Sequence, residues 1–158
     1  MKFYENPSTL IAEQDQFELD IHAFASGEIN PVKFKALRVA HGVYEQRQEH
    51  TYMIRIRCAA GGITPAQLKK VAELGKLYGS GEVHFTTRQE VQVHDVLLQN
   101  VIKVIRGLNE VDLSSRGGGG NTIRNIYVRR FKTSYRVCKR NIDWYLTRIS
   151  WRSKKTGN

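Results

Sequence analysis

Basic and polar side chains recur at alternate positions in two stretches of this sequence that have the composition of β-strands. Side chains on a strand alternate between its two faces. In residues 51–58, Arg55 and Arg57 share one face. The apolar positions of the opposite parity are Tyr52, Ile54, Ile56 and Cys58. We therefore expect one face to pack on a core and the other to offer guanidinium groups to a ligand rich in carboxylates or oxyanions.

The same alternation continues in residues 83–94. The apolar parity is carried by Phe85, Val91 and Val93. The opposite parity is carried by His84, Thr86, Arg88, Gln92 and His94. Arginine on one antiparallel strand is commonly just solvated, so either stretch alone indicates little. The polar parity shared by both stretches favours a common binding face. We expect few acidic side chains on this face to offset the positive charge of its arginines.

Arg116 is followed by four consecutive glycines, at positions 117–120, and then by Asn121. Such a run is costly in chain entropy and is useful where backbone must approach a ligand closely. Glycine runs are also common in linkers. The run alone therefore leaves a binding loop and a linker both open.

The composition excludes several classes of protein. The chain has 158 residues, enough for one domain with an extension, and its hydrophobic content of 41% can form a packed core. It contains no long apolar stretch and no apolar segment of the signal-peptide kind at its N-terminus. Cys58 and Cys138 give neither a disulfide framework nor metal-ligand spacing. We expect a cytoplasmic protein without a membrane partner and without a protein-bound metal.

The formal net charge of +10 belongs almost entirely to residues 127–158. This tail has 10 Lys and Arg against a single Asp, whereas residues 1–126 have 15 against 14 Asp and Glu. The tail also contains six aromatic residues, with neither strand nor helix periodicity. Basic residues interleaved with aromatics suit nonspecific binding of single-stranded nucleic acid. We expect the tail to be poorly ordered and to lie outside the cooperative fold.

Hydrophobic periodicity predicts an α+β fold. Residues 14–25 and 31–39 have helical spacing, and residues 41–50 read as a loop. The elements that follow are a strand at 51–58, a helix from Thr64-Pro65, strands near 82–86 and 91–95, a helix at 97–108 and a short last strand around 111–113. This β-α-β-β-α-β order is that of a ferredoxin-like half-domain, an antiparallel sheet with helices on one face.

Four motifs, in this order, resemble the siroheme-dependent sulfite and nitrite reductases. They are His-Gly-Val-Tyr-Glu-Gln-Arg (41–47), Met-Ile-Arg-Ile-Arg (53–57) with Gly61-Gly62, Thr-Thr-Arg-Gln-Glu-Val-Gln-Val-His (86–94) and Gly-Asn-Thr-Ile-Arg-Asn-Ile (120–126). The resemblance covers roughly residues 15–126. It implies part of an enzyme that reduces sulfite or nitrite at a siroheme coupled to a [4Fe-4S] cluster, with an electron donor that the sequence does not identify.

The resemblance also implies roles for individual residues. Arg55, Arg124 and Asn121 fall at positions that bind the substrate oxyanion. The siroheme contacts that it implies are Arg57, Arg88, Gln92, Thr86, His94 and His84, the last at a position where the family often has arginine. Siroheme carries many carboxylates, which agrees with a face rich in guanidinium groups.

The family's cluster ligands, a Cys-x5-Cys pair and a later Cys-x3-Cys pair, are both missing from this sequence. We therefore expect this chain to hold neither cofactor as a resident group and to be inactive alone, with only weak affinity of its arginine face for polycarboxylates or oxyanions. The resemblance ends after Ile126, where the composition also changes. These two signals suggest a truncated or frame-shifted reading.

The sequence thus predicts four segments: a helical extension and loop at 1–50, the half-domain at 51–114, the start of a siroheme and cluster domain at 115–126, and the tail. An exposed half-domain surface also predicts a homodimer. Two other interpretations stay open. One is a basic ferredoxin-like module that binds RNA or DNA, although its face of Arg, Gln and His lacks the paired aromatics of an RRM. The other is a small subunit that scaffolds a partner carrying the cofactors.

Overall fold

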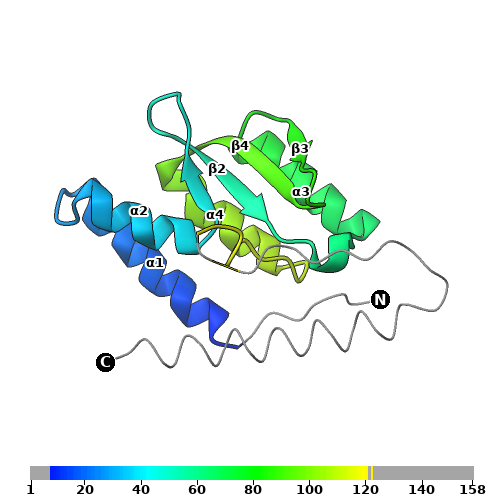
Figure 1. Cartoon of the computed structure of the whole chain (residues 1–158), viewed down its shortest axis with the longest axis horizontal. Helices are drawn as coiled ribbons and strands as arrows, with labels where there is room; N and C mark the ends of the chain where they lie inside the picture. The colour runs from blue at the N-terminus through cyan, green and yellow to red at the C-terminus, as the bar shows by residue number, and fades with distance from the viewer. Residues whose placement is uncertain (1–7, 121, 123–158) are drawn as a thin grey trace.

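The computed structural model of the chain describes residues 8–120 and residue 122. Its elements are α1 (Leu10–Ala25), α2 (Pro31–Ala40), β1 (Val43–Glu45), β2 (Thr51–Ile56), the 3-10 turn η1 (Ala59–Gly61), α3 (Pro65–Tyr78), β3 (Val83–Phe85), β4 (Val91–Leu97) and α4 (Leu98–Asn109). The strands form one antiparallel sheet in the order β1-β2-β4-β3, and Figure 1 shows the helices beside and behind it. The predicted α+β fold is confirmed.

Local sequence fixes where two of the helices begin. The Asn30 side chain accepts a hydrogen bond from the Lys33 amide at 2.9 Å, and Pro31 occupies the first turn of α2. Thr64 and Gln67 form a capping box at the start of α3, in which each side chain accepts from the other residue's backbone N–H. Both starts agree with those predicted from the Asn-Pro and Thr-Pro pairs.

The edge of the sheet next to β2 differs from the prediction. The segment predicted as a loop over 41–50 contains β1, whose Val43 pairs with Ile54. Residues 110–112 form a turn, and only Ser114 reaches the sheet in the place of the predicted last strand, as an isolated bridge to Arg57. Because β1 already occupies most of this edge, the chain after α4 can pair with β2 only beyond the end of β1.

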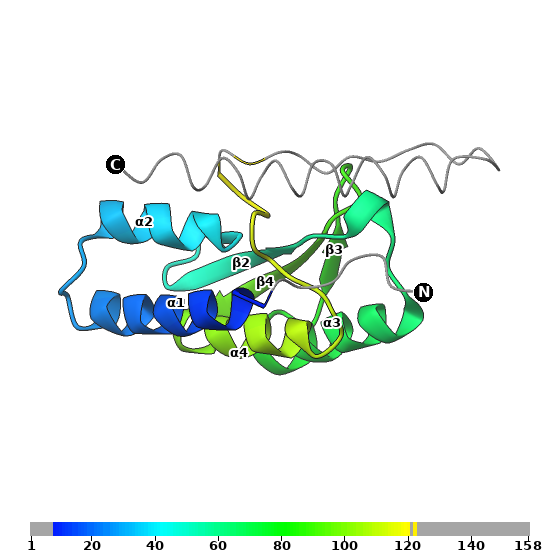
Figure 2. The same cartoon turned by 90° about the horizontal axis from the view of Figure 1, so that it is seen from below.

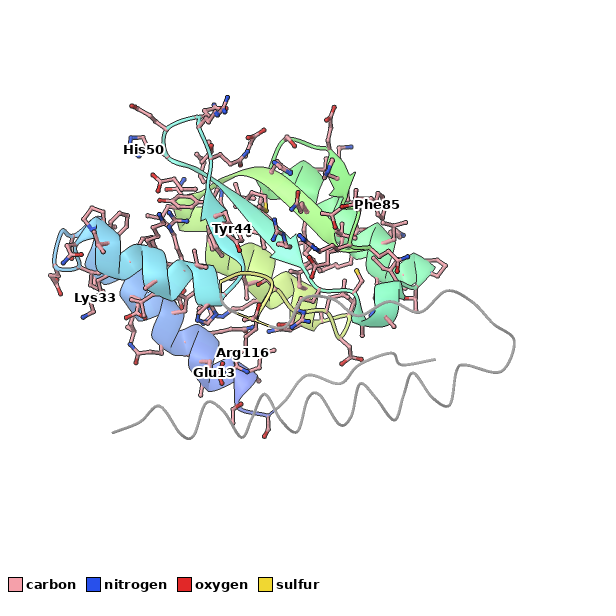
Figure 3. The ribbon with its side chains drawn as sticks, viewed as in Figure 1. Glu13, Lys33, Tyr44, His50, Phe85 and Arg116 are labelled. Carbon is pink, nitrogen blue, oxygen red and sulfur yellow. The ribbon has the colours of Figure 1, made fainter. Side chains whose placement is uncertain are left out.

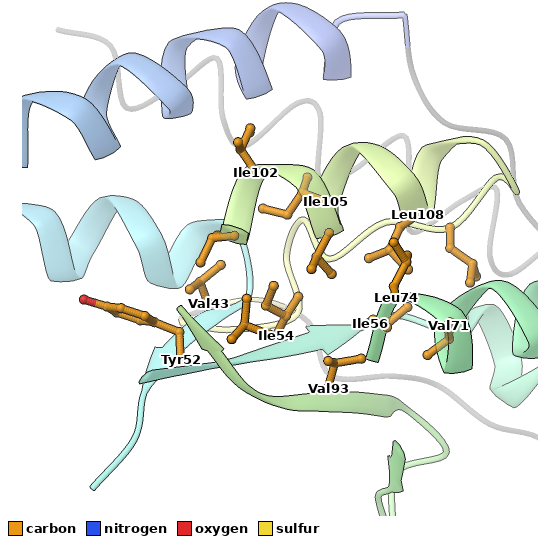
Figure 4. Close-up of a cluster of buried hydrophobic side chains, with 14 of the residues drawn as sticks. Val43, Tyr52, Ile54, Ile56, Val71, Leu74, Val93, Ile102, Ile105 and Leu108 are labelled. Carbon is orange, nitrogen blue, oxygen red and sulfur yellow. The ribbon is translucent and has the colours of Figure 1, made fainter. Parts of the chain in front are cut away.

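Three helices, α1, α3 and α4, cover one face of the sheet (Figure 2). Figure 4 shows core side chains that α3 and α4 contribute beside those of β2 and β4. The α4 residues Val101, Val104, Ile105 and Leu108 are at most 2% exposed, and Phe17 of α1 joins the same cluster. Burial of a side chain of this size contributes about 1.5–3 kcal/mol. The core side of the sheet is therefore closed to ligands.

Several predictions fall on residues that the structure does not describe, among them Asn121, Arg124, Cys138 and the whole basic tail. In the part that it does describe, no helix is both long and apolar enough to cross a membrane.

Candidate anion-binding face

The face of the sheet opposite to α3 and α4 carries a row of polar side chains across three strands. Arg55 of β2 pairs in register with Gln92 of β4, and Gln92 pairs with His84 of β3. Their neighbours on β2, Ile54 and Ile56, are completely buried on the other side. The alternation that predicted two different faces is thus confirmed. We call the residues Tyr44, Arg55, Arg57, His84, Gln92 and His94 the polar face.

Arg55 lies at the centre of the polar face and is held on several sides. Its guanidinium carbon lies 5.0 Å from the centre of the Tyr44 ring, and its Nη1 donates to the Gly118 carbonyl at 3.4 Å. With the Gln92 amide oxygen turned toward it, Arg55 donates to that oxygen from Nε and Nη2, at 3.0 and 3.1 Å. About a fifth of the Arg55 side chain (19%) stays exposed, so an anion can reach it from solvent.

The expectation of little acid among these residues is wrong, because Glu90 lies beside Arg55. Glu90 is only 6% exposed, and its Oε2 is 4.0 Å from the Arg55 Nε. A buried carboxylate is costly unless a positive group compensates it. Arg55 therefore neutralises Glu90 as well as facing outward, which lowers the net positive charge of the polar face.

A β-bulge in β4 sets the position of His94. Tyr52 pairs with Val96 but Ile54 pairs with Val93, so two residues of β4 lie opposite one of β2. The second of these, Asp95, has a φ of +59°, and its amide donates to the Gln46 Oε1 at 2.8 Å. The Gln46 amide nitrogen lies 3.2 Å from His94 Nδ1. Burial, followed by the charge of nearby His84, lowers the pKa of His94, so this ring is held neutral.

The four-glycine run packs against the polar face, and each glycine has a structural reason. Gly117 and Gly120 have φ of +68° and +72°, a conformation that other residues adopt at a cost. A Cβ on Gly118 would lie 2.6 Å from the Arg55 carbonyl oxygen, and a Cβ on Gly119 would overlap the Tyr44 hydroxyl. That hydroxyl accepts a hydrogen bond from the Gly120 amide at 3.1 Å. The run is therefore a close-packed loop over β1 and β2 rather than a linker.

Arg116, at the start of the glycine run, forms an ion pair with Glu13 of α1 (Figure 3). The Gly117 amide next to it donates to the Ala40 carbonyl at 2.9 Å. Arg57 also faces this loop, because a Cβ on Gly117 would lie 3.2 Å from its Nη1. The loop is thus fixed at one end to α1 and α2 and lies against two arginines of the polar face.

Thr86 and Arg88 lie in the turn between β3 and β4 rather than in the central row. The Thr86 hydroxyl accepts hydrogen bonds from the Arg88 and Glu90 amides at 3.3 and 3.1 Å, so it shapes the turn. Arg88 itself is exposed. The Gln89 side chain occupies the space that a Cβ on Gly61 would need, which explains a glycine at that position.

A hollow with a volume of about 320 Å³ lies at the end of β3 away from this turn. Its lining residues include His84 and His94 of the polar face together with Gln46, Glu82 and Asp95. The two imidazole rings meet edge to face with their centres 6.0 Å apart. The two histidines therefore join the central row to this hollow.

Of two residues predicted on the apolar side of the strands, Phe85 is exposed and Cys58 is buried. Phe85 was predicted to face the core but is 56% exposed, because β3 is the outer strand of the sheet (Figure 3). Cys58 is buried, and burial together with Glu90 raises the pKa of its thiol to about 11. Within the described ranges, no group of three or more His, Cys, Asp or Glu is arranged to hold a metal.

Sequence reasoning missed Tyr44, Gln46 and Glu90 as members of this region. Glu90 has the same parity as Gln92, so the alternation contained the signal. Tyr44 and Gln46 come from the segment interpreted as a loop, and their position depends on β1.

Arg38, which sequence reasoning also missed, joins α2 to β1. It is 5% exposed, and its guanidinium contacts Glu45 at 2.8 Å and the Val43 carbonyl at 3.2 Å.

Comparison with known proteins agrees with this architecture. Residues 44–111 match the family model of the nitrite/sulfite reductase ferredoxin-like half domain. The structure of the Mycobacterium tuberculosis NirA protein superposes with a TM-score of 0.58 at 18% identity, covering 73% of this chain and 27% of that chain. The fold is thus that of a ferredoxin-like half domain.

Three proteins of known sequence are similar to this chain and are named as nitrite or sulfite reductases. The chain is 37% identical over 97 residues to the assimilatory ferredoxin-dependent nitrite reductase of Haloferax mediterranei, covering 54% of this chain and 17% of the relative. It is 40% identical over 85 residues to the sulfite reductase [NADPH] hemoprotein beta-component of Lysinibacillus sphaericus, covering 51% and 15%. With the second such component of Klebsiella pneumoniae it shares 32% over 142 residues, covering 79% and 25%.

Residues 44–111 thus form a ferredoxin-like half domain of the kind found in nitrite and sulfite reductases, the family that the four motifs resemble. The chain spans a quarter or less of the length of each of these three relatives.

Proposed function

We propose that this chain supplies part of the siroheme- and anion-binding surface of a sulfite or nitrite reductase. The observation that carries the proposal is the row Arg55–Gln92–His84, with the glycine loop packed along its edge. Guanidinium, amide and imidazole groups are donors that suit carboxylates and oxyanions. On the side away from the core helices His84 is exposed and Arg55 is partly exposed, whereas Gln92 between them is buried.

The residues fit siroheme by their chemistry. Siroheme has many peripheral carboxylates, and Arg57, Arg88, Gln92 and His84 would hold them. When bound, siroheme would supply an iron that passes electrons to an oxyanion substrate. Arg55 is also proposed to face that substrate, together with Arg124 and Asn121 beyond the described ranges. Glu90 limits the charge available, so we expect the affinity of this face to be modest.

The substrate class follows from the names of the relatives, which reduce nitrite or sulfite. A [4Fe-4S] cluster and an electron donor would have to come from elsewhere in a complete enzyme. Cys58 is a poor cluster ligand because burial raises the pKa of its thiol to about 11. We propose that the cytoplasm is the compartment in which this chain functions, as expected from its sequence.

A titration of the chain with siroheme, followed by absorbance, tests the proposal. We expect binding that weakens with added salt, because charged groups at a surface are screened. The Arg88→Ala variant should bind about fivefold more weakly, the size of one exposed ion pair. Lys33→Ala is a matched control, because Lys33 is also exposed but lies on α2, far from the turn (Figure 3). A siroheme affinity that changes neither with added salt nor in the Arg88→Ala variant would contradict the proposal.

A further inference from the structure

A chain of hydrogen bonds runs along the polar face from the β-bulge to Arg55, and its direction is fixed at the bulge. The Asp95 amide can only donate, so the oxygen of the Gln46 side chain must face it. The Gln46 amide N–H groups then point at His94 Nδ1, 3.2 Å away. His94 Nδ1 must accept this bond, and the proton of the neutral ring must lie on Nε2.

The chain continues from His94 to Gln92. With its proton on Nε2, His94 donates to the Gln92 Oε1 at 3.3 Å. The amide N–H groups of Gln92 are then turned toward Arg55, whose guanidinium is also only a donor. In the opposite amide orientation, Gln92 accepts from Arg55 at 3.0 and 3.1 Å, but its N–H groups then face the Nε2–H of His94.

Either orientation therefore places two donors against each other. Neutral histidine and the glutamine amide each accept a hydrogen bond at one end of this path and donate one at the other end. The donor-to-acceptor direction is therefore the same for every bond along the path. The path begins at a backbone donor and ends at an arginine donor, so it lacks one acceptor. An added acceptor at Arg55 would accept hydrogen bonds from the Arg55 guanidinium and from the Gln92 amide N–H. The bonds from Asp95 to Gln46, from Gln46 to His94 and from His94 to Gln92 would then all be kept.

We propose that Gln46 and His94 are positioning residues that turn the Gln92 amide N–H toward a carboxylate or oxyanion bound at Arg55. The inference rests on the proposed function, because the anion is a siroheme carboxylate or a substrate oxyanion. Without the anion, the Gln92 oxygen turns to Arg55, and charge-assisted bonds favour that orientation. Gln92 thus changes its amide orientation when the anion binds.

The surroundings agree with this assignment. The lowered pKa of His94 keeps the ring neutral, as the path requires. Glu90 lies 4.0 Å from Arg55 Nε, and His84 lies 6.0 Å from the His94 ring centre. The charge of Asp95 acts on His94 in the opposite direction to burial and His84, and Glu82 lines the same hollow. None of these groups takes the place of Gln46 between His94 and the Asp95 amide. Arg55 remains accessible, with 19% of its side chain exposed.

The test reads the tautomer of His94 by long-range ¹H–¹⁵N correlation in the full chain, assigned with a His94→Gln variant. A pH near about 8.5 keeps the imidazole neutral. We expect the Nε2–H form in the native chain. Gln46→Glu replaces the amide by a carboxylate that accepts from both Asp95 N–H and His94, so the proton should move to Nδ1. Gln48→Glu is the matched control, because it adds the same charge to the same loop at an exposed position.

Sulfate binding by the same three chains completes the test. In Gln46→Glu the Gln92 oxygen should stay on Arg55, and sulfate should bind about tenfold more weakly than in Gln48→Glu, the effect of about one hydrogen bond to a charged group. An Nδ1–H tautomer in the native chain, or equal sulfate affinity in the two variants, would overturn the inference. The tautomer is measured without ligand. A failure of this inference can therefore be told apart from a failure of the proposed function. The latter would appear as absence of siroheme binding by the native chain.

Discussion

His41 gives the sharpest prediction of how this chain responds to acid. Its ring stacks on Phe17, with the ring centres 4.1 Å apart and the planes at 11°. It also immediately precedes Gly42, which abuts Ser115 and the Arg55 carbonyl. Burial, and next the charge of Arg116, lower the pKa of His41 from 6.5 to about 4. The neutral ring is therefore part of the packing that holds the glycine loop and β1 in place.

The sign and size of the effect follow from the two pKa values. In the unfolded chain His41 takes up a proton near 6.5, whereas in the folded chain it resists protonation down to about 4. The unfolded state thus binds more protons in this window, so stability falls as the pH falls. Between about pH 7.5 and about pH 5 the loss should be on the order of 2 kcal/mol from His41 alone.

Urea unfolding near pH 7.5 and near pH 5 measures this loss for the native chain and for His41→Phe, which keeps the aromatic stack. The variant should lose about 2 kcal/mol less on acidification than the native chain. His22→Phe is the control, because His22 is exposed in the last turn of α1 and should leave the acid sensitivity unchanged. Equal acid sensitivity in the native and His41→Phe chains would refute the reasoning.

Three further predictions concern the whole chain. Anaerobic reconstitution with iron and sulfide should leave the chain without a four-iron cluster, since the cysteine pairs are missing; four acid-labile sulfides per chain would contradict this. Removing residues 127–158 should shift the melting temperature by less than about 5 °C and abolish nonspecific nucleic-acid binding, and a larger shift would mean that the tail packs. The tail-deleted chain should form a dimer in sedimentation, and Phe85→Lys on the outer strand should weaken it; a monomer at micromolar concentration would argue against pairing of this edge.

The two faces of the sheet could be predicted from sequence because the side-chain period of a strand is two. Ile54 and Val93 are buried, and Arg55 and Gln92 lie together on the other side. The helix starts were equally accessible, because Asn30-Pro31 and Thr64-Pro65 are local capping signals. These features depend only on residues close together in the chain.

The remaining features depend on contacts between distant residues. β1 has three residues and mixed polarity, so its pairing with β2 left no periodic signal. The bulge at Asp95 changes the register without any glycine to mark it. Exposure of Phe85 follows from the place of β3 in the sheet, which periodicity does not give. The need for glycine at 118 and 119 likewise follows from the close approach of Arg55 and Tyr44, which are distant in the sequence.

The most direct test of the central claim is to locate bound siroheme on the chain by paramagnetic line broadening, with metal-free sirohydrochlorin as the diamagnetic reference. We expect the side-chain signals of Arg55, Gln92 and His84 to broaden, because they form the row on the face away from the core. Signals of Lys103 and Arg106, which lie on the surface of α4 beyond the core, should stay sharp. Broadening centred on α4, or confined to residues 127–158, would contradict the assignment of the polar face as the binding surface.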